Sequence, residues 1–179
     1  MNRRLGPADA IRPCGTGDVT DICAVINDAA IAYRGIIAPD CWKEPYMPLA
    51  ELRDEIDQSV LFWGFWEGGR LAAVMGLQEV RDVALIRHAY TRTAYRGRGM
   101  GTALLEHLQH EARLPMLVGT WKAATWAIAF YRHHGFQLVQ PQRKETLLQH
   151  YWSVPARQRD ESVVLADGRW FATRETEPV

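Results

Sequence analysis

The sequence predicts a mixed α/β domain in which a mostly antiparallel sheet of about six to seven strands is flanked by helices. Segments with apolar residues at helical spacing alternate with short runs of β-branched, leucine and aromatic residues. Three of these runs follow one another in the middle of the chain with only tight turns between them, which is typical of an antiparallel meander. The expected strands are residues 10–12, 60–66, 71–78, 83–91, 116–120, 136–139 and 162–166.

Local signals mark the expected helices. Asp18 is a candidate N-cap for a helix that Gly35 ends, and Pro48 can occupy the first turn of a second helix. Residues 36–47 between them are irregular. Further helices are expected from the glycine-rich turn before Thr102 to about residue 114, over residues 125–133 and over residues 144–152.

Length and composition indicate a single globular domain. The chain has 179 residues, of which 47% are hydrophobic and 23% charged, close to the globular average. We expect one domain over residues 1–172 and a polar tail over residues 173–179. Lys plus Arg and Asp plus Glu each number 21, so the net charge is zero. A general nucleic-acid-binding role is disfavoured, because it needs clustered cations.

Cysteines, histidines and apolar runs predict the cellular setting. Cys14, Cys23 and Cys41 are odd in number and fit no zinc-ligand spacing, so we expect reduced thiols. His107 and His110 have no third ligand in register, and no metal is expected. The N-terminus lacks the apolar core of a signal peptide, and no apolar run approaches the ~20 residues of a membrane span. The sequence therefore predicts a cytoplasmic protein without a membrane partner.

The segment Arg96-Gly97-Arg98-Gly99-Met100-Gly101 carries the clearest chemical signal. Its glycines remove side chains where a ligand can approach the backbone. The N–H groups that begin the following helix lack partners within the helix and lie at the positive end of its dipole. This arrangement predicts a phosphate or pyrophosphate site, to which the arginines add positive charge.

Other interpretations of this turn are weaker or less specific. A solvated glycine-rich turn without a ligand remains the simplest alternative. A dinucleotide fingerprint would need glycine where Thr102 stands, and it would need a preceding βαβ unit rather than a meander. A Walker loop would need a lysine after Gly101, where Thr102 again stands.

The turn resembles the R/Q-x-x-G-x-G/A signature of the GNAT superfamily of acyl-CoA-dependent N-acetyltransferases. Residues 127–136, Ala-Ile-Ala-Phe-Tyr-Arg-His-His-Gly-Phe, are similar to the second signature of that family, a helix with a tyrosine that ends in Gly-Phe. The resemblance covers about residues 11–139. It implies the GNAT fold, with a twisted central sheet and two strands that splay apart to leave a cleft for coenzyme A.

The resemblance also implies which residues bind acetyl-CoA as co-substrate. The turn would hold the pyrophosphate, and the backbone at the end of the preceding strand would pair with the pantetheine arm. Tyr131 matches the tyrosine that protonates the departing CoA thiolate. The implied cofactor-binding residues are Tyr90, Thr91, Arg92, Arg96, Gly97, Arg98, Gly99, Met100, Gly101, Thr102, Ala124, Ala127, Phe130 and Tyr131.

Two departures from the family pattern concern catalysis. Family members with a glutamate or histidine base carry it at the positions of Leu85 and Arg87, and neither residue can serve as a base. His88, Glu79, Asp82 and a water relay remain candidates. Strand alternation points His88 to the other face unless a bulge intervenes. The second departure is Ala124, where many family members have asparagine.

The resemblance also implies that the acceptor site lies under the loop of residues 36–47, which joins the first two expected helices. Trp42 and Tyr46 would shape substrate selection there, and Arg87 is a candidate partner for an acidic substrate group. The aromatic hairpin of residues 62–66 is read as core packing in preference to an acceptor pocket.

These observations predict transfer of an acetyl group from acetyl-CoA to a primary amine of a small molecule, by direct attack in a ternary complex. Two alternatives stay open. One is acetylation of a protein or peptide, and the other is a CoA-binding sensor with weak catalysis. The apolar strand 162–166 is expected at a sheet edge, which is compatible with a homodimer.

Overall fold

The computed structural model describes residues 10–175, and within this range the chain divides into two compact units. The first unit comprises residues 10–32, 44–78 and 87–111, and the second comprises residues 33–43, 79–86 and 112–175. No helix within the described range combines the length and the apolar character that a membrane crossing requires.

Seven strands of the described range form one sheet in the order β1-β2-β3-β4-β5-β7-β6. Pairing is antiparallel for β1–β2, β2–β3, β5–β7 and β6–β7, and parallel for β4–β5. The expected mixed α/β fold with a mostly antiparallel sheet is therefore confirmed. The strands are β1 (Ala10–Pro13), β2 (Leu61–Glu67), β3 (Arg70–Val80), β4 (Val83–Thr91), β5 (Met116–Trp121), β6 (Gln137–Leu138) and β7 (Ser162–Ala166).

The α-helices match the expected ones, with two additions near the C-terminus. The α5 helix begins three residues earlier than expected, with Pro141 in its first turn, and α6 and α7 were not predicted. The α7 helix includes residues 173–175 of the expected polar tail, whose remaining residues, 176–179, lie outside the described range. The helices are α1 (Val19–Ala30), α2 (Leu49–Asp57), α3 (Met100–Glu111), α4 (Thr125–His133), α5 (Pro141–Tyr151), α6 (Ala156–Asp160) and α7 (Gly168–Glu175).

The expectation that residues 162–166 form an edge strand is wrong. β7 lies between β5 and β6, with Ala166 opposite both Leu117 of β5 and Gln137 of β6. The chain after α4 returns as the two-residue strand β6 and covers the side of β7 that β5 leaves open. Pairing of β7 with a second subunit therefore gives no basis for a homodimer.

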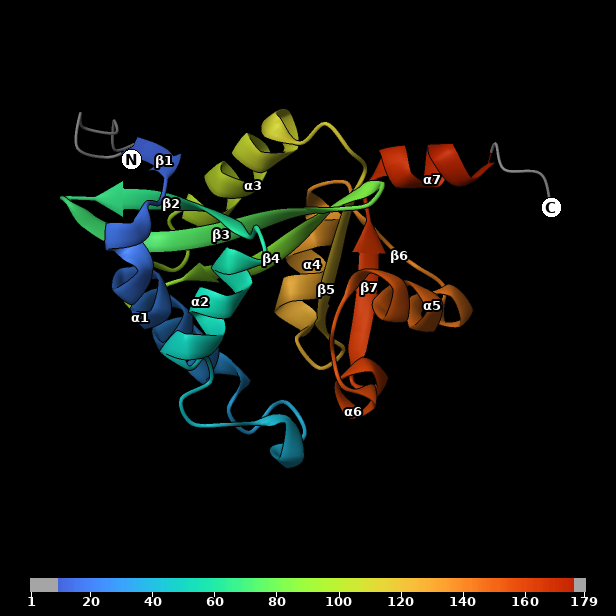
Figure 1. The fold of residues 1–179 in the computed structure, drawn as a ribbon, viewed down its shortest axis with the longest axis horizontal. Helices are drawn as coiled ribbons and strands as arrows, with labels where there is room; N and C mark the ends of the chain where they lie inside the picture. Colours follow the sequence, from blue (N-terminus) through green and yellow to red (C-terminus); the bar gives the residue numbers. More distant parts are fainter. Residues whose placement is uncertain (1–9, 176–179) are drawn as a thin grey trace. The chain divides into compact units, whose positions relative to one another are not determined.

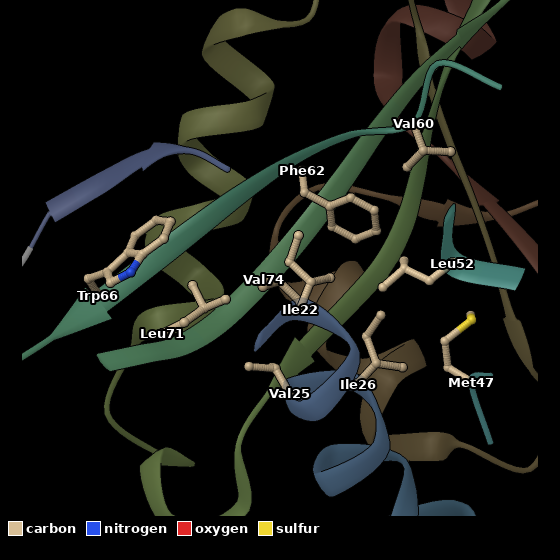
Figure 2. Packing of buried hydrophobic residues seen from close by; sticks show 10 residues of the cluster. All are labelled: Ile22, Val25, Ile26, Met47, Leu52, Val60, Phe62, Trp66, Leu71 and Val74. Atoms are coloured by element: carbon tan, nitrogen blue, oxygen red, sulfur yellow. The ribbon is translucent and has the colours of Figure 1, made fainter. Parts of the chain in front are cut away.

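In the first unit, α1 and α2 lie on one side of the sheet strands and α3 lies on the other (Figure 1). Ile22, Val25 and Ile26 recur on one face of α1 and point toward residues of α2, β2 and β3 (Figure 2). Burial of this apolar surface is the main stabilising term. The cluster comprises Ile22, Val25, Ile26, Met47, Leu52, Val60, Phe62, Trp66, Leu71 and Val74.

The aromatic hairpin packs as core, as expected. Phe62, Phe65 and Trp66 are buried. Trp63 points to the side of the sheet opposite to Phe62 and Trp66, where its ring centroid lies 4.3 Å from that of His107 on α3. Alternation along β2 thus supplies apolar groups to helices on both faces.

The second unit has its own core, which α5 and α7 cover. Leu147, Leu148 and Tyr151 of α5 pack against the sheet, and the Tyr151 hydroxyl donates to Asp82 Oδ1 at 2.6 Å. Asp82 lies in the turn between β3 and β4, so this bond fixes α5 to that turn. The cluster comprises Val83, Leu85, Leu117, Val139, Leu147, Leu148, Tyr151, Val164, Ala166 and Trp170.

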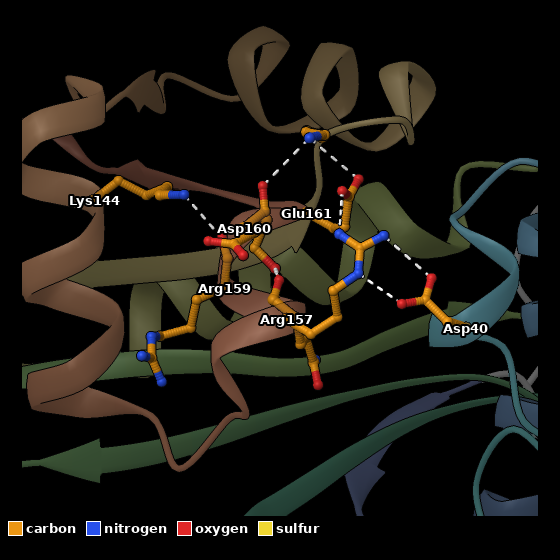
Figure 3. A network of polar contacts seen from close by, with 9 residues as sticks. Asp40, Lys144, Arg157, Arg159, Asp160 and Glu161 are labelled. Carbon is orange, nitrogen blue, oxygen red and sulfur yellow. Dashed lines mark hydrogen bonds and ion pairs between the residues drawn. The ribbon is translucent and has the colours of Figure 1, made fainter.

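An exposed ion-pair network connects α6 to the 3-10 turn of residues 39–41 (Figure 3). The Arg157 guanidinium donates to Asp40 Oδ2 at 2.6 Å and to Glu161 Oε1 at 2.6 Å, and Lys122 Nζ lies 3.2 Å from Glu161 Oε2. Hydrogen bonds from Arg157 lower the pKa of Asp40 and of Glu161. Both carboxylates therefore stay charged at mildly acidic pH, and the connection weakens once the pH falls through their lowered pKa values.

Gly64 on β2 provides the sharpest packing test. A Cβ at this position would lie 2.4 Å from Trp66 Cζ3 and 2.5 Å from Leu71 Cδ1. The Arg12 guanidinium, 3.6 Å from the Trp66 ring centroid, hinders movement of that ring. Gly64→Ala is expected to lower the free energy of unfolding by about 1–3 kcal/mol, as measured by chemical denaturation.

Gly17→Ala is the matched control, because a Cβ at Gly17 meets nothing within 4 Å. It should leave stability nearly unchanged. Equal denaturation midpoints for Gly64→Ala and the unmodified protein would contradict the packing described for β2.

Candidate functional site

The glycine-rich turn of the first unit adopts a backbone that favours glycine. Gly97 and Gly99 have φ values of +73° and +80°, in the left-handed region. A Cβ at either position would meet no atom within 4 Å, so the backbone angles and not crowding explain these glycines. The space over the turn is open to a ligand.

The turn leads directly into α3. The Gly99 carbonyl accepts the N–H of Ala103 at 2.9 Å, which is the first helical bond. The N–H groups of the first helical residues therefore have no acceptor within the helix and lie at its positive end. Met100, Leu104 and Leu105 are buried, and their packing fixes the direction in which these groups point. This geometry can bind an anion such as a pyrophosphate.

The three arginines near the turn each bond a protein oxygen. Such bonds fix the turn, while the remaining N–H groups of each guanidinium can still reach an anion. Thr93 adds a further bond from its N–H to Asp28 Oδ2 at 2.6 Å. The arginine bonds are Arg92 Nε to the Leu71 carbonyl at 2.9 Å, Arg96 Nη2 to the Ala29 carbonyl at 2.8 Å and Arg98 Nη1 to Glu67 Oε2 at 2.9 Å.

A local distortion in β4 changes where its side chains point. His88 has a φ of +50°, which is rare for a residue other than glycine and indicates a β-bulge. Arg87 and His88 are adjacent in sequence, yet both reach the same oxygen, Oε2 of Glu55 on α2. The bulge that would place His88 on the face of Arg87 is therefore present.

Gly76 on β3 allows this distortion. A Cβ at Gly76 would lie 2.9 Å from the Arg87 carbonyl oxygen and 3.2 Å from the Arg87 Cβ. The first of these atoms belongs to the backbone and cannot move aside by rotation of a side chain. The bulge and the missing side chain at Gly76 thus depend on each other.

Polar contacts extend from this pair of residues. Arg87 Nη2 lies 3.0 Å from Glu55 Oε2, and Arg87 Nη1 donates to Gln78 Oε1 at 2.7 Å. The His88 ring contacts the carboxylate of Glu55 and stacks beside Phe62 and Tyr90, at centroid distances of 5.9 and 6.4 Å. The side chains of Glu55, Arg87 and His88 keep 17%, 20% and 13% of their surface exposed, so solvent or a ligand can reach them.

Sequence reasoning missed Glu55. It lies 33 residues from His88, and no local pattern relates the two positions. Another base candidate, Glu79, is an exposed residue of the second unit and does not join this network. Leu85 is completely buried in the core, which explains why that position carries no base. No group of three or more His, Cys, Asp or Glu side chains among the described residues could hold a metal ion.

Tyr131 lies in the second unit, near the end of α4. Its side chain is buried, and burial raises its pKa, with a further contribution from nearby Tyr33. The Tyr131 carbonyl accepts the N–H groups of His134 and Phe136, and Gly135 has a φ of +86°. Gly135 thus ends the helix as expected. A buried phenol with a raised pKa holds its proton and can donate it.

The remaining α4 residues of the second signature surround this tyrosine. The Phe130 ring centroid lies 5.2 Å from that of Tyr131, and both Phe130 and Ala127 are partly buried. Ala124 is fully buried at the N-cap, where its carbonyl accepts the N–H of Ala127 at 3.0 Å. Alanine supplies no side-chain cap there.

The two expected acceptor-loop residues belong to different units. In the second unit, the Arg34 guanidinium carbon lies 6.0 Å from the Trp42 ring centroid. In the first unit, Tyr46 packs against the core, and the neighbouring Met47 exchanges two hydrogen bonds of 2.8 Å with the Asn27 side chain. Asn27, which sequence reasoning also missed, fixes the end of the loop to α1.

Comparison with known proteins identifies the family. The model of the acetyltransferase (GNAT) domain matches residues 25–151. A search of curated protein sequences finds no significant match. Solved structures with the same fold include the PaiA N-acetyltransferase of Thermoplasma acidophilum in complex with coenzyme A, with 17% identity, a TM-score of 0.66, and coverage of 89% of this chain and 98% of that chain.

Two further similar structures are of enzymes whose names point to different acceptors. The ribosomal-protein-S18-alanine N-acetyltransferase of Escherichia coli has 20% identity and a TM-score of 0.61, with coverage of 89% of this chain and 92% of that chain. The N-acetylglutamate synthase of Neisseria gonorrhoeae, complexed with coenzyme A and N-acetyl-glutamate, has 19% identity and a TM-score of 0.61, with coverage of 89% and 34%. With a family model that matches well over half of its residues, the chain belongs to the GNAT family of acetyltransferases.

Proposed function

We propose that the protein transfers an acetyl group from acetyl-CoA to a primary amine of a small molecule, by direct attack in a ternary complex. The observation that carries this proposal is the open glycine turn at the start of α3 in a chain of the GNAT family. The left-handed backbone at Gly97 and Gly99 directs unpartnered helix N–H groups toward a position where a pyrophosphate fits.

The rest of the coenzyme is proposed to bind along β4. The backbone near Tyr90 and Thr91, at the end of β4 in the first unit, would pair with the pantetheine arm as an added strand would. When bound, coenzyme A supplies the activated acetyl thioester.

Two side chains are proposed to move protons. His88 accepts the proton that the substrate ammonium must lose before it can attack. Its support is the bulge, which places its partly exposed ring in a polar network. Tyr131 donates its phenolic proton to the departing thiolate, and its raised pKa keeps the phenol protonated at neutral pH, as this role requires. A backbone N–H near the end of β4 stabilises the charge that develops on the carbonyl oxygen.

The net charge and the similar structures bear on the class of acceptor. The zero net charge disfavours recognition of a strongly charged macromolecule. The similar structures include a ribosomal-protein acetyltransferase as well as an N-acetylglutamate synthase, so protein acetylation is the second candidate. The absence of a base at Leu85 and the alanine at Ala124 favour a sensor role instead. The position of His88 supplies the basic group that a sensor would not need.

A screen of amines and peptides with acetyl-CoA tests the function. Thiol release should rise above background with at least one small primary amine and not with peptides alone. Turnover with peptides only would favour protein acetylation. Tight coenzyme binding without turnover on any acceptor would favour the sensor.

Gly99→Glu is expected to abolish coenzyme binding, because a carboxylate would stand where the pyrophosphate binds. Gly99→Ala separates the two effects of this change. Its methyl group meets open space, so it carries only the backbone cost of a left-handed residue, about 1–2 kcal/mol. Calorimetry should show weakened coenzyme binding by Gly99→Ala and no coenzyme binding by Gly99→Glu. Undiminished binding by Gly99→Glu would place the pyrophosphate elsewhere.

Tyr131→Phe is expected to lower kcat by about 10- to 100-fold with little change in coenzyme affinity, since only the acidic hydroxyl is removed. Steady-state kinetics at saturating substrates and calorimetry with coenzyme A measure the two quantities. An unchanged kcat would remove Tyr131 from the acid role. Phe136→Leu, at a buried ring whose centroid lies 5.7 Å from that of Tyr131, serves as a control for altered packing around the tyrosine.

A further inference from the structure

We propose that Glu55 is a positioning residue that sets the proton-accepting nitrogen of His88, and that Arg87 opposes its effect by sharing the same carboxylate oxygen. This inference rests on the proposed function and names the residues that regulate the basic group. Glu55 touches neither substrate nor coenzyme in this scheme and acts through the His88 ring.

The geometry starts from one oxygen atom. Oε2 of Glu55 contacts His88 Nε2 and lies 3.0 Å from Arg87 Nη2. Only the bulge at His88 makes this sharing possible, because consecutive residues of a regular strand point to opposite faces. Gly76 leaves the space for the bulged backbone. The convergence of three charged or ionisable groups therefore depends on a specific backbone distortion.

The contact with Glu55 selects one tautomer of the ring. A carboxylate accepts hydrogen bonds and does not donate them, so the nitrogen that faces it carries the proton. Nε2 is that nitrogen, and the neutral ring then presents the lone pair of Nδ1. Within residues 10–175 the His88 ring makes no other hydrogen bond. Nδ1 is therefore the atom available to accept a proton from an ammonium group.

Glu55 and Arg87 carry opposite charges beside the His88 ring. Arg87 also draws on the same Glu55 oxygen that the ring contacts, so the two side chains compete for it. The other terminal nitrogen of the Arg87 guanidinium, Nη1, donates to Gln78 Oε1 at 2.7 Å. Arg87 lies beside the Glu55 carboxylate, Tyr90 of β4 and Phe62 of β2 lie beside the His88 ring, and Gln78 of β3 bonds Arg87.

With these roles, the protons lost and gained in acetyl transfer balance. His88 takes one proton from the substrate ammonium at Nδ1 and later releases it to solvent. As the new N–C bond forms and the C–S bond breaks, Tyr131 gives its phenolic proton to the departing sulfur. The nitrogen releases its second proton to solvent on becoming an amide, and Tyr131 regains one proton from solvent. One proton is released overall for each acetyl group transferred.

The test compares the pH dependence of kcat/KM among charge variants, with the acceptor identified by the amine screen. In Glu55→Gln the rising limb of the kcat/KM profile should move to lower pH, and in Arg87→Met it should move to higher pH, since each change removes one charge beside the ring. Asp54→Asn removes an exposed carboxylate one residue earlier on α2 and should leave the limb in place.

A second measurement does not depend on turnover. The pH titration of the His88 ring signal in NMR spectra, assigned with His88→Gln, should move in the same two directions. Thermal melting and coenzyme binding by each variant establish that the fold is retained. An active, folded Glu55→Gln whose limb and ring signal both stay in place would overturn the proposal and leave the proposed function intact. Opposite movements of the ring signal without turnover on any amine would uphold the coupling and reject the proposed function.

Discussion

The N–H groups at the start of α3 can face a ligand because the preceding turn takes left-handed backbone angles at Gly97 and Gly99. Two arginine side chains hold the turn in place. Arg96 bonds the last turn of α1 and Arg98 bonds β2, so the turn is fixed to two elements that are distant in sequence. Positive charge near the turn thus has a structural role, and the backbone supplies the donors whose direction is fixed before a ligand arrives.

A second constraint acts on β4. Two residues that a regular strand would separate are brought to one carboxylate by a bulge, and β3 accommodates that bulge with a glycine. Such distortions cost free energy and persist where the surroundings determine them. One of these two residues, Arg87, stands where the resemblance to the family implied a base.

Much of the fold could be predicted because the signals are local. Strand β4, helix α4 and strand β7 have the bounds that periodicity and the flanking turns predicted. Helix α7 was missed because Asp167-Gly168 reads as a turn, whereas in the fold Asp167 Oδ1 accepts the N–H of Trp170 and caps a helix. The place of β7 inside the sheet was missed because strand order is not a local property.

The candidate site shows the same division. The glycine turn, the Tyr131 helix and its Gly135 end are contiguous in sequence and were found. Glu55 and Asn27 were not, because each acts on a residue at least 20 positions away and belongs to an ordinary amphipathic helix. The alternation of β4 shows that His88 shares a face with Arg87 only if the strand contains a bulge. Whether that bulge forms depends on Gly76 of the neighbouring strand β3.

The interleaving of the two compact units in the chain has a consequence for how this protein can be divided. The chain passes from one unit to the other at residues 32–33, 43–44, 78–79, 86–87 and 111–112. Two of these passages fall within strands β3 and β4 and not in linkers. No single cut can therefore release either unit as a contiguous fragment, and a shortened chain that keeps only the glycine turn would lack segments of its own core.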